Sequence, residues 1–517
     1  MALAHPLWAL PEVVREVMRQ SADEQDTLAQ CARVSRAFSE PALEVLWEKQ
    51  EGLELFFRIL SSSIKMVDIG TFGDRRVISS NRLANSFFLC ADIKDEEWVR
   101  LQYYANLVRV FMSQQDSIDG LVAAALIQKL NGRALFPRLK CLIWHRPFDA
   151  AASALLVMFL SPMLRTVHLN IMETRPVERC TLTTYPSAAE YAYSSVLRTI
   201  HSCAPKAEEI LLVAGGYFCT VDRLREFRNL RVLALHNVVY LTPVFDVCNT
   251  LPSLWHLDIH MALRHFPDPE LDDLPSSPVA TLSPLTLLEL SGPPLMVVSA
   301  VDALNAPNLR SLSLSFVANA DAWKRCSASV VSRFGATLHN LEISVEGALR
   351  DVRPDVPYLL PDFFAPLFAL RDLRMVEILS HFNSPFAVRP QDLTELATAW
   401  PQLCTLVLPS GFVLKFAPPD PGLPITALET LAATCPHLEL LIVPLPHHAA
   451  LLEEGRDEAR VPASQSSLKE IRLLGGEWPP EAHERCMSYV KRLFPEACLI
   501  LFDTDFEDDW SEPDEWG

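Results

Sequence analysis

The phrase LPSLWHLDI at residues 251–259 returns as LSPLTLLEL at 282–290 and as APNLRSLSL at 306–314. Each copy has the pattern apolar-x-x-apolar-x-apolar, formed in the third copy by Leu309, Leu312 and Leu314. Successive side chains of a β-strand point to opposite faces, so alternating apolar residues share one face. The phrase therefore predicts a short strand with one buried side and one polar side.

The same phrase recurs along most of the chain. Its first apolar residues are Leu107, Leu139, Leu164, Ala207, Leu230, Leu254, Leu285, Leu309, Leu338, Leu370, Leu403, Leu438, Leu468 and Ala497. The 390 residues from Leu107 to Ala497 span thirteen intervals, which gives a mean repeat of 30 residues. A repeat of 20–50 residues predicts a solenoid, and the phrase matches the strand of a leucine-rich repeat.

Short helices are expected before many of these strands. The segments 299–307, 391–401 and 425–436 have apolar residues three and four positions apart, and each contains or ends on a proline just before the next strand. We therefore expect an α/β fold in which a curved parallel sheet lies inside and helices lie outside, over residues 101–502. The Leu, Ile and Val residues of the phrase are interpreted as core.

The first 50 residues have a different pattern, which predicts three short helices. Pro11 suits the first turn of a helix that carries Val14, Val17 and Met18. A second helix is expected after Asp23, with Leu28 on its apolar face, and a third from about Ser39. Such a small core gives an isolated segment little stability, so a partner protein is expected to cover the remaining apolar surface.

This N-terminal segment resembles an F-box. The resemblance rests on an ordered set of residues: Leu10, Pro11, Val17, Met18, Leu28, Cys31, Val34, Ser35, Arg36, Phe38, Leu46 and Trp47. An F-box followed by irregular leucine-rich repeats looks like the F-box/leucine-rich-repeat proteins, especially their divergent fungal families. The resemblance covers residues 1–50 and, more loosely, 101–502; residues 51–100 match no motif and are expected to form a helical linker or cap.

The resemblance implies a partner and a set of contacts. An F-box binds the Skp-type adaptor of a cullin-RING (SCF) ubiquitin ligase, and the repeats present a protein substrate. The implied adaptor contacts are Leu10, Pro11, Val14, Val17, Met18, Leu28 and Val34. Leu46 and Trp47 would instead pack on the next helix, at 52–60. Without the resemblance, the segment would be only a helical cap on the solenoid.

Composition excludes several classes of protein. The chain of 517 residues has 45 Lys and Arg against 64 Asp and Glu, a net charge of −19, which argues against nucleic-acid binding. No secretory signal, membrane-spanning run or CxxC pair is visible, which favours the cytoplasm or the nucleus. Residues 503–517 carry eight acids and no base and are expected to be a disordered tail.

Motifs for catalysis are missing from the sequence. It contains no GxxxxGK[ST], GxGxxG, HExxH or GxSxG, and no arrangement of residues that would accept ubiquitin covalently. We therefore predict a protein that is not an enzyme and that needs no cofactor.

Histidines gather where the concave face of the repeats is expected. The candidate substrate-binding residues are His168, His236, His256, Asp258 and His260. Imidazole and carboxylate groups also suit a transition metal, but a solvated face tolerates polar rings without any ligand, and no metal centre is predicted. The predicted function is a substrate-recognition subunit of an SCF-type ubiquitin ligase. The alternative is an interaction scaffold that acts outside ubiquitination.

Overall fold

A computed structural model describes most of the chain. The described residues are 10–68, 85–113, 117–145, 150–171, 188–214, 221–262, 280–317, 319–346, 358–380, 386–408, 425–444, 467–474 and 480–502. They form two compact units, residues 1–254 and 255–517, and each unit is described by itself. The acidic tail expected at 503–517 lies outside the described residues.

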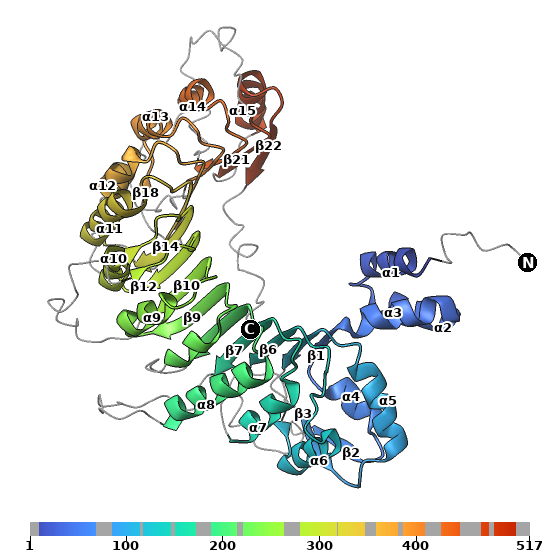
Figure 1. Ribbon diagram of the computed structural model, residues 1–517. Helices are drawn as coiled ribbons and strands as arrows, with labels where there is room; N and C mark the ends of the chain where they lie inside the picture. Colours follow the sequence, from blue (N-terminus) through green and yellow to red (C-terminus); the bar gives the residue numbers. More distant parts are fainter. Residues whose placement is uncertain are drawn as a thin grey trace, which may run out of the picture. The chain divides into compact units, whose positions relative to one another are not determined.

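The first unit begins with three helices (Figure 1): α1 (Pro11–Gln20), α2 (Gln25–Val34) and α3 (Arg36–Glu48). Pro11 stands at the start of α1, as expected. The third helix begins earlier than the sequence suggested, because the Ser35 hydroxyl accepts a hydrogen bond from the Phe38 amide and caps it there. Pro41 consequently lies inside α3.

Residues 51–100 form more than a helical linker. They contain α4 (Glu54–Ile59), β2 (Ile64–Asp68), β3 (Asn85–Leu89) and the start of α5 (Asp95–Ala105). Strands β2 and β3 pair antiparallel, and β3 pairs with the short β5 (Ser117–Ile118). This small sheet interrupts the stretch that the sequence left unassigned.

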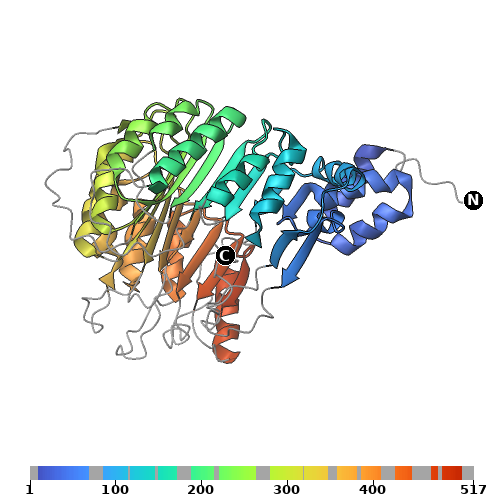
Figure 2. The same cartoon turned by 90° about the horizontal axis from the view of Figure 1, so that it is seen from below.

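The rest of the first unit is a parallel sheet with helices between its strands. Its strands follow the order β1 (Lys49–Glu51), β4 (Val110–Ser113), β6 (Cys141–His145), β7 (Thr166–Ile171), β8 (Glu209–Ala214) and β9 (Val232–Val238). The intervening helices are α6 (Gly120–Leu130), α7 (Ala150–Phe159), α8 (Ala188–Cys203) and η3 (Asp222–Glu226), and α9 (Leu241–Cys248) closes the unit. Figure 2 shows the helices on one side of these strands.

The second unit continues the same alternation. Its parallel sheet has the order β10 (His256–Met261), β12 (Leu287–Gly292), β14 (Ser311–Val317), β15 (Asn340–Glu346), β17 (Met375–Ser380), β19 (Thr405–Val407), β20 (Leu440–Pro444), β21 (Glu470–Leu474) and β22 (Cys498–Phe502). Its helices are α10 (Pro294–Ala303), α11 (Ala320–Phe334), α12 (Leu360–Phe364), η5 (Ala365–Ala369), α13 (Pro390–Ala399), η6 (Ile425–Ala427), α14 (Leu428–Thr434) and α15 (Pro480–Leu493). Two small two-stranded pairs join β11 (Ala280–Thr281) to β13 (Leu304–Asn305) and β16 (Tyr358–Leu359) to β18 (Phe386–Ala387).

The strands coincide with the repeated phrase, and burial follows its alternation. In β12 and β14, for example, Leu288, Leu290, Leu312 and Leu314 are buried, while the residues between them are half-buried. The strands pair in register, so Leu288 lies beside Leu312, and Leu312 beside Leu341. The buried residues therefore form continuous rows under the helices, as the sequence pattern predicted.

Three copies of the phrase have a different register from the predicted one. At the first copy the buried residues are Val108 and Phe111, one position after the predicted Leu107. At 367–375 the strand core is Val376 and Ile378, so the predicted Met375 points to the polar side and the copy starts at Leu373. At the last copy, Leu499 and Leu501 lie beside the core residues Ile471 and Leu473, one position before the residues expected from Ala497. In each case several apolar residues are adjacent, so more than one register fits the pattern.

The helices of the described ranges are short or amphipathic. None of them combines the length and the apolar character that crossing a lipid bilayer requires.

Candidate interaction surfaces

The three N-terminal helices enclose a small core. Its buried side chains are Val14, Met18, Leu28 and Ala42, and partly buried residues such as Phe38 pack against them. Val14, Met18 and Leu28 are 1%, 5% and 1% exposed. The sequence named these three as adaptor contacts, and this needs correction: their side chains hold the helices together and are not on the surface. An ion pair of 2.7 Å between Arg15 and Glu44 also links α1 to α3, and it raises the Arg15 pKa, chiefly through the hydrogen bond.

Other apolar side chains of the same helices remain on the surface. Leu10 is 48% exposed, Val17 is 42% exposed and Val34 is 72% exposed. Val17 lies within α1, and Leu10 is the residue directly before that helix. Val34 is the last residue of α2. Of the predicted adaptor contacts, these three are available to a partner, and Pro11 is placed only by its backbone at the start of α1.

Trp47 connects the three helices to the elements that follow. Its ring centroid lies 5.2 Å from that of Phe56 in α4 and 4.4 Å from that of Tyr104 in α5. The prediction that Trp47 packs on the helix at 52–60 is therefore confirmed. Leu46 packs instead against the core of the three helices.

On the sheet of the first unit, histidines and an acid lie on the side opposite the buried rows. His168 of β7 lies 2.9 Å from a carboxylate oxygen of Glu209 in β8, and the Thr166 hydroxyl donates a 3.1 Å hydrogen bond to the other oxygen. His145 of β6 has a lowered pKa because burial and then the neighbouring His168 disfavour its charge. His236 of β9 is half-buried on the same side of its strand.

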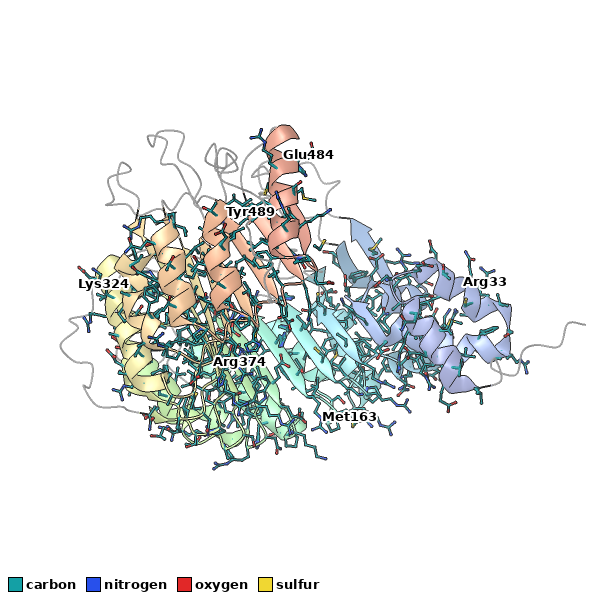
Figure 3. The ribbon with its side chains drawn as sticks, turned by 90° about the horizontal axis from the view of Figure 1, so that it is seen from above. Arg33, Met163, Lys324, Arg374, Glu484 and Tyr489 are labelled. Carbon is teal, nitrogen blue, oxygen red and sulfur yellow. The ribbon has the colours of Figure 1, made fainter. Side chains whose placement is uncertain are left out.

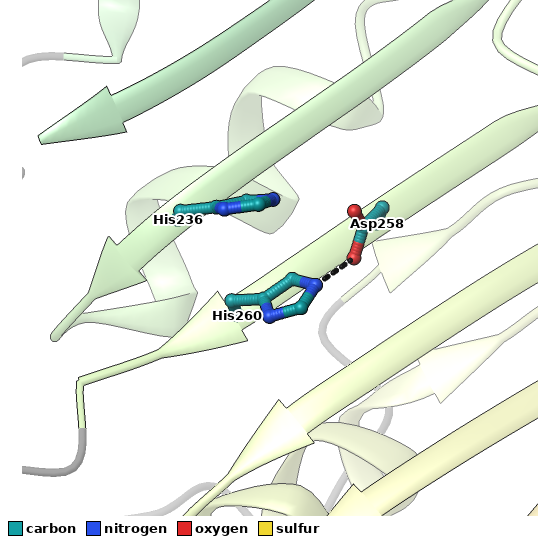
Figure 4. Close-up of side chains that lie close together, drawn as sticks. All are labelled: His236, Asp258 and His260. Atoms are coloured by element: carbon teal, nitrogen blue, oxygen red, sulfur yellow. Dashed lines mark ion pairs between the residues drawn. The ribbon is translucent and has the colours of Figure 1, made fainter. Parts of the chain in front are cut away.

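The second unit has two further histidine–acid pairs. The His256 ring lies 2.9 Å from a carboxylate oxygen of Glu289 on the adjacent strand β12. His260 lies 3.2 Å from Asp258, two residues earlier on β10. Figure 4 marks this second pair with a dashed line. Asp258 is largely covered and His260 is about half exposed, with side chains 14% and 46% exposed.

The three side chains drawn in Figure 4 belong to two units. His236 comes from the first unit, and Asp258 and His260 come from the second. Within the second unit, the pair supplies one imidazole and one carboxylate, whereas protein zinc sites use three or four ligands. The predicted role of these residues in binding a substrate stays a prediction.

The sheet of the second unit also carries a row of acids that the sequence reasoning missed. Asp258, Glu289, Glu342 and Glu377 lie in one line across β10, β12, β15 and β17, with Ser313 of β14 in the middle. Burial raises the pKa of Glu342, and the charges of Glu377 and Glu289 raise it further; burial also raises the pKa of Glu377.

A signal for this row was present in the sequence. Asp258, Glu289 and Glu342 each stand between the last two apolar residues of their phrase. Glu377 was hidden because the phrase at 367–375 had been assigned a register three residues too early. An acid at this repeated position of the phrase is therefore the signal that predicts the row.

No known protein family matches the chain, and no curated protein has a similar sequence.

Proposed function

We propose that this protein is the substrate-recognition subunit of an SCF-type ubiquitin ligase. Its N-terminal helices would bind a Skp-type adaptor, and its parallel sheet would bind a protein substrate. The observation that carries the proposal is the division of apolar residues in the N-terminal helices. Val14, Met18 and Leu28 suffice for an internal core, yet Leu10, Val17 and Val34 remain exposed.

Exposed apolar side chains on a small bundle favour a protein partner. Covering each such side chain lowers the free energy of the complex. Truncating contacts of this kind at the centre of an interface weakens binding strongly. The rest of the chain supports a binding role as well, because paired charged and polar side chains lie on the sheet opposite its helices. The substrate would contact His168, His236, His256, Asp258 and His260.

A pulldown with a Skp-type adaptor tests the first half of this proposal. The variant Leu10→Ser/Val17→Ser/Val34→Ser should lose most adaptor binding, by about tenfold or more. The control is Val99→Ser/Leu121→Ser, which changes apolar residues of α5 and α6 that are 65% and 64% exposed, and it should bind like the wild type. Equal binding by the triple variant, or no binding by the wild type, would refute the adaptor contact.

Co-purification of a cullin with the wild-type chain tests the second half. Recovery of adaptor and cullin together, lost in the triple variant, is the result expected for a ligase subunit. Recovery of the adaptor without a cullin would favour the scaffold that acts outside ubiquitination.

A further inference from the structure

The first unit has a line of basic residues at one edge of its parallel sheet. The residues directly before β4, β6, β7, β8 and β9 are Arg109, Lys140, Arg165, Glu208 and Arg231. Their backbones are joined in sequence: the amide of each donates a hydrogen bond of 2.7–2.8 Å to the carbonyl of the one before. Because neighbouring strands are about 4.8 Å apart, four bases and one acid lie in a single line.

The turns that precede these residues add more positive charge. Arg138 and Lys206 stand in the turns before β6 and β8, and both are exposed. In the equivalent turn before β7, Met163 is 48% exposed and is labelled in Figure 3. We call the six bases of this edge the basic strip: Arg109, Arg138, Lys140, Arg165, Lys206 and Arg231.

The charge of the basic strip is poorly neutralised within the unit. Between β4 and β9 the acid in the line is Glu208, and its carboxylate is shared between Arg165 at 3.4 Å and Arg231 at 3.7 Å. The pKa of Arg109 is lowered, first by burial and then by the positive charge of Arg138. The charges of Glu48 and Glu44 raise this pKa, and Glu48 continues the line before β1, where its carbonyl accepts a 2.8 Å hydrogen bond from the Arg109 amide. The six bases therefore face three acids, Glu208 within the strip and Glu44 and Glu48 near Arg109, in a chain whose net charge is −19.

We propose that the basic strip binds an acidic, extended segment of a partner protein. From β4 to β9 the edge crosses four strand-to-strand steps, or roughly 19 Å, which about six residues of an extended peptide cover. The carboxylates pair with the exposed bases, and the side chain of Met163 offers one apolar contact among them. This inference does not depend on the proposed role in ubiquitination.

The shortness of the strip favours a peptide over a nucleic acid. Charges are screened within about 8 Å at physiological salt, so the strip attracts only what lies on it. A long polyanion would extend past the strip onto a chain with 19 more negative than positive charges. A short acidic segment avoids that repulsion.

Binding of a labelled peptide to the full-length protein tests the proposal. The probe is a fluorescently labelled synthetic peptide of about eight alternating Asp and Glu residues. Its binding is measured by fluorescence anisotropy. The wild type should bind it, with affinity that falls as salt rises from about 0.05 to 0.3 M. The variant Arg138→Glu/Lys140→Glu/Lys206→Glu should bind about tenfold more weakly or worse.

A matched variant controls for net charge. Arg310→Glu/Lys324→Glu/Arg374→Glu reverses three exposed bases of the second unit and should bind the peptide within about twofold of the wild type. Should the reversed strip impair folding, as seen by circular dichroism, the neutral variant Lys140→Gln/Lys206→Gln provides the same comparison.

Several results would overturn the proposal. These are the lack of peptide binding at low salt, equal affinity of the strip variant and the wild type, or equal losses in the strip and control variants. Tighter binding of a single-stranded oligonucleotide than of the peptide would assign the strip to nucleic acid. Binding of the peptide only after removal of residues 503–517 would assign the strip to the chain's own acidic tail.

Discussion

The N-terminal helices and the parallel sheets use their apolar residues differently. In the sheet, alternation sends each buried residue to one face, so Leu288, Leu312 and Leu341 form one continuous row. In the helices, the apolar residues divide: Val14 and Met18 close the core, whereas Val17 between them is exposed. The difference shows that an apolar residue in a repeated strand indicates core, while one in a small helical bundle indicates either core or a surface for a partner.

The largest expected effect lies in the sheet. Leu312→Asp should lower the free energy of unfolding by about 4 kcal/mol or more, because it places an unpaired charge between Leu288 and Leu341. The damage should spread to neighbouring strands, since each repeat is stabilised by the next. Urea denaturation measures it. Ser311→Asp is the control, on the polar side of the same strand, and should cost far less. Equal costs would mean that the two sides are assigned wrongly.

A smaller effect is expected in the helices, and it separates core from surface. Met18→Ala should destabilise the three helices by about 2 kcal/mol, because its side chain is 5% exposed in their core. Val17→Ala, one residue earlier, should change stability by less than about 0.5 kcal/mol. Hydrogen exchange of residues 11–48 reports this local stability. Equal hydrogen-exchange rates in the two variants would contradict the assignment of Met18 to the core and Val17 to the surface.

The smallest effect concerns the acidic row of the second unit. The raised pKa of Glu342 means that its ionisation destabilises the folded state. Glu342→Gln should therefore stabilise the protein at pH 7, by roughly 0.5 kcal/mol after solvent screening. This gain should vanish below the ordinary glutamate pKa of about 4.3, where both folded and unfolded states carry the proton. Thermal melting at pH 7 and pH 4 measures the difference. A less stable variant at pH 7 would show that the carboxylate is held by favourable contacts instead.

Much of the architecture could be predicted because strands have a period of two. Eleven of the fourteen copies of the phrase have the predicted register, and the strands they form pair in parallel. The predicted register is wrong for the copies near Leu107, Met375 and Ala497. Apolar residues are adjacent there, so two registers fit the repeated phrase equally well. The three-helix start was also predictable, although Ser35 rather than Ser39 caps the third helix.

The amino-acid sequence by itself determined where the strands lie and which side of most of them is buried, because each strand's alternation is a local property. Only the tertiary structure decided which polar residues meet. His168 contacts Glu209 and His256 contacts Glu289, each from a neighbouring strand, although the two residues of each pair are more than thirty positions apart in the chain. The basic strip arises in the same way: Arg109, Lys140 and Arg165 become neighbours only because parallel strands bring their amino ends to one edge. Packing likewise decided that Val14 is buried and Val17 exposed. Both are apolar residues of one short helix, and only contact with α2 and α3 separates core from surface.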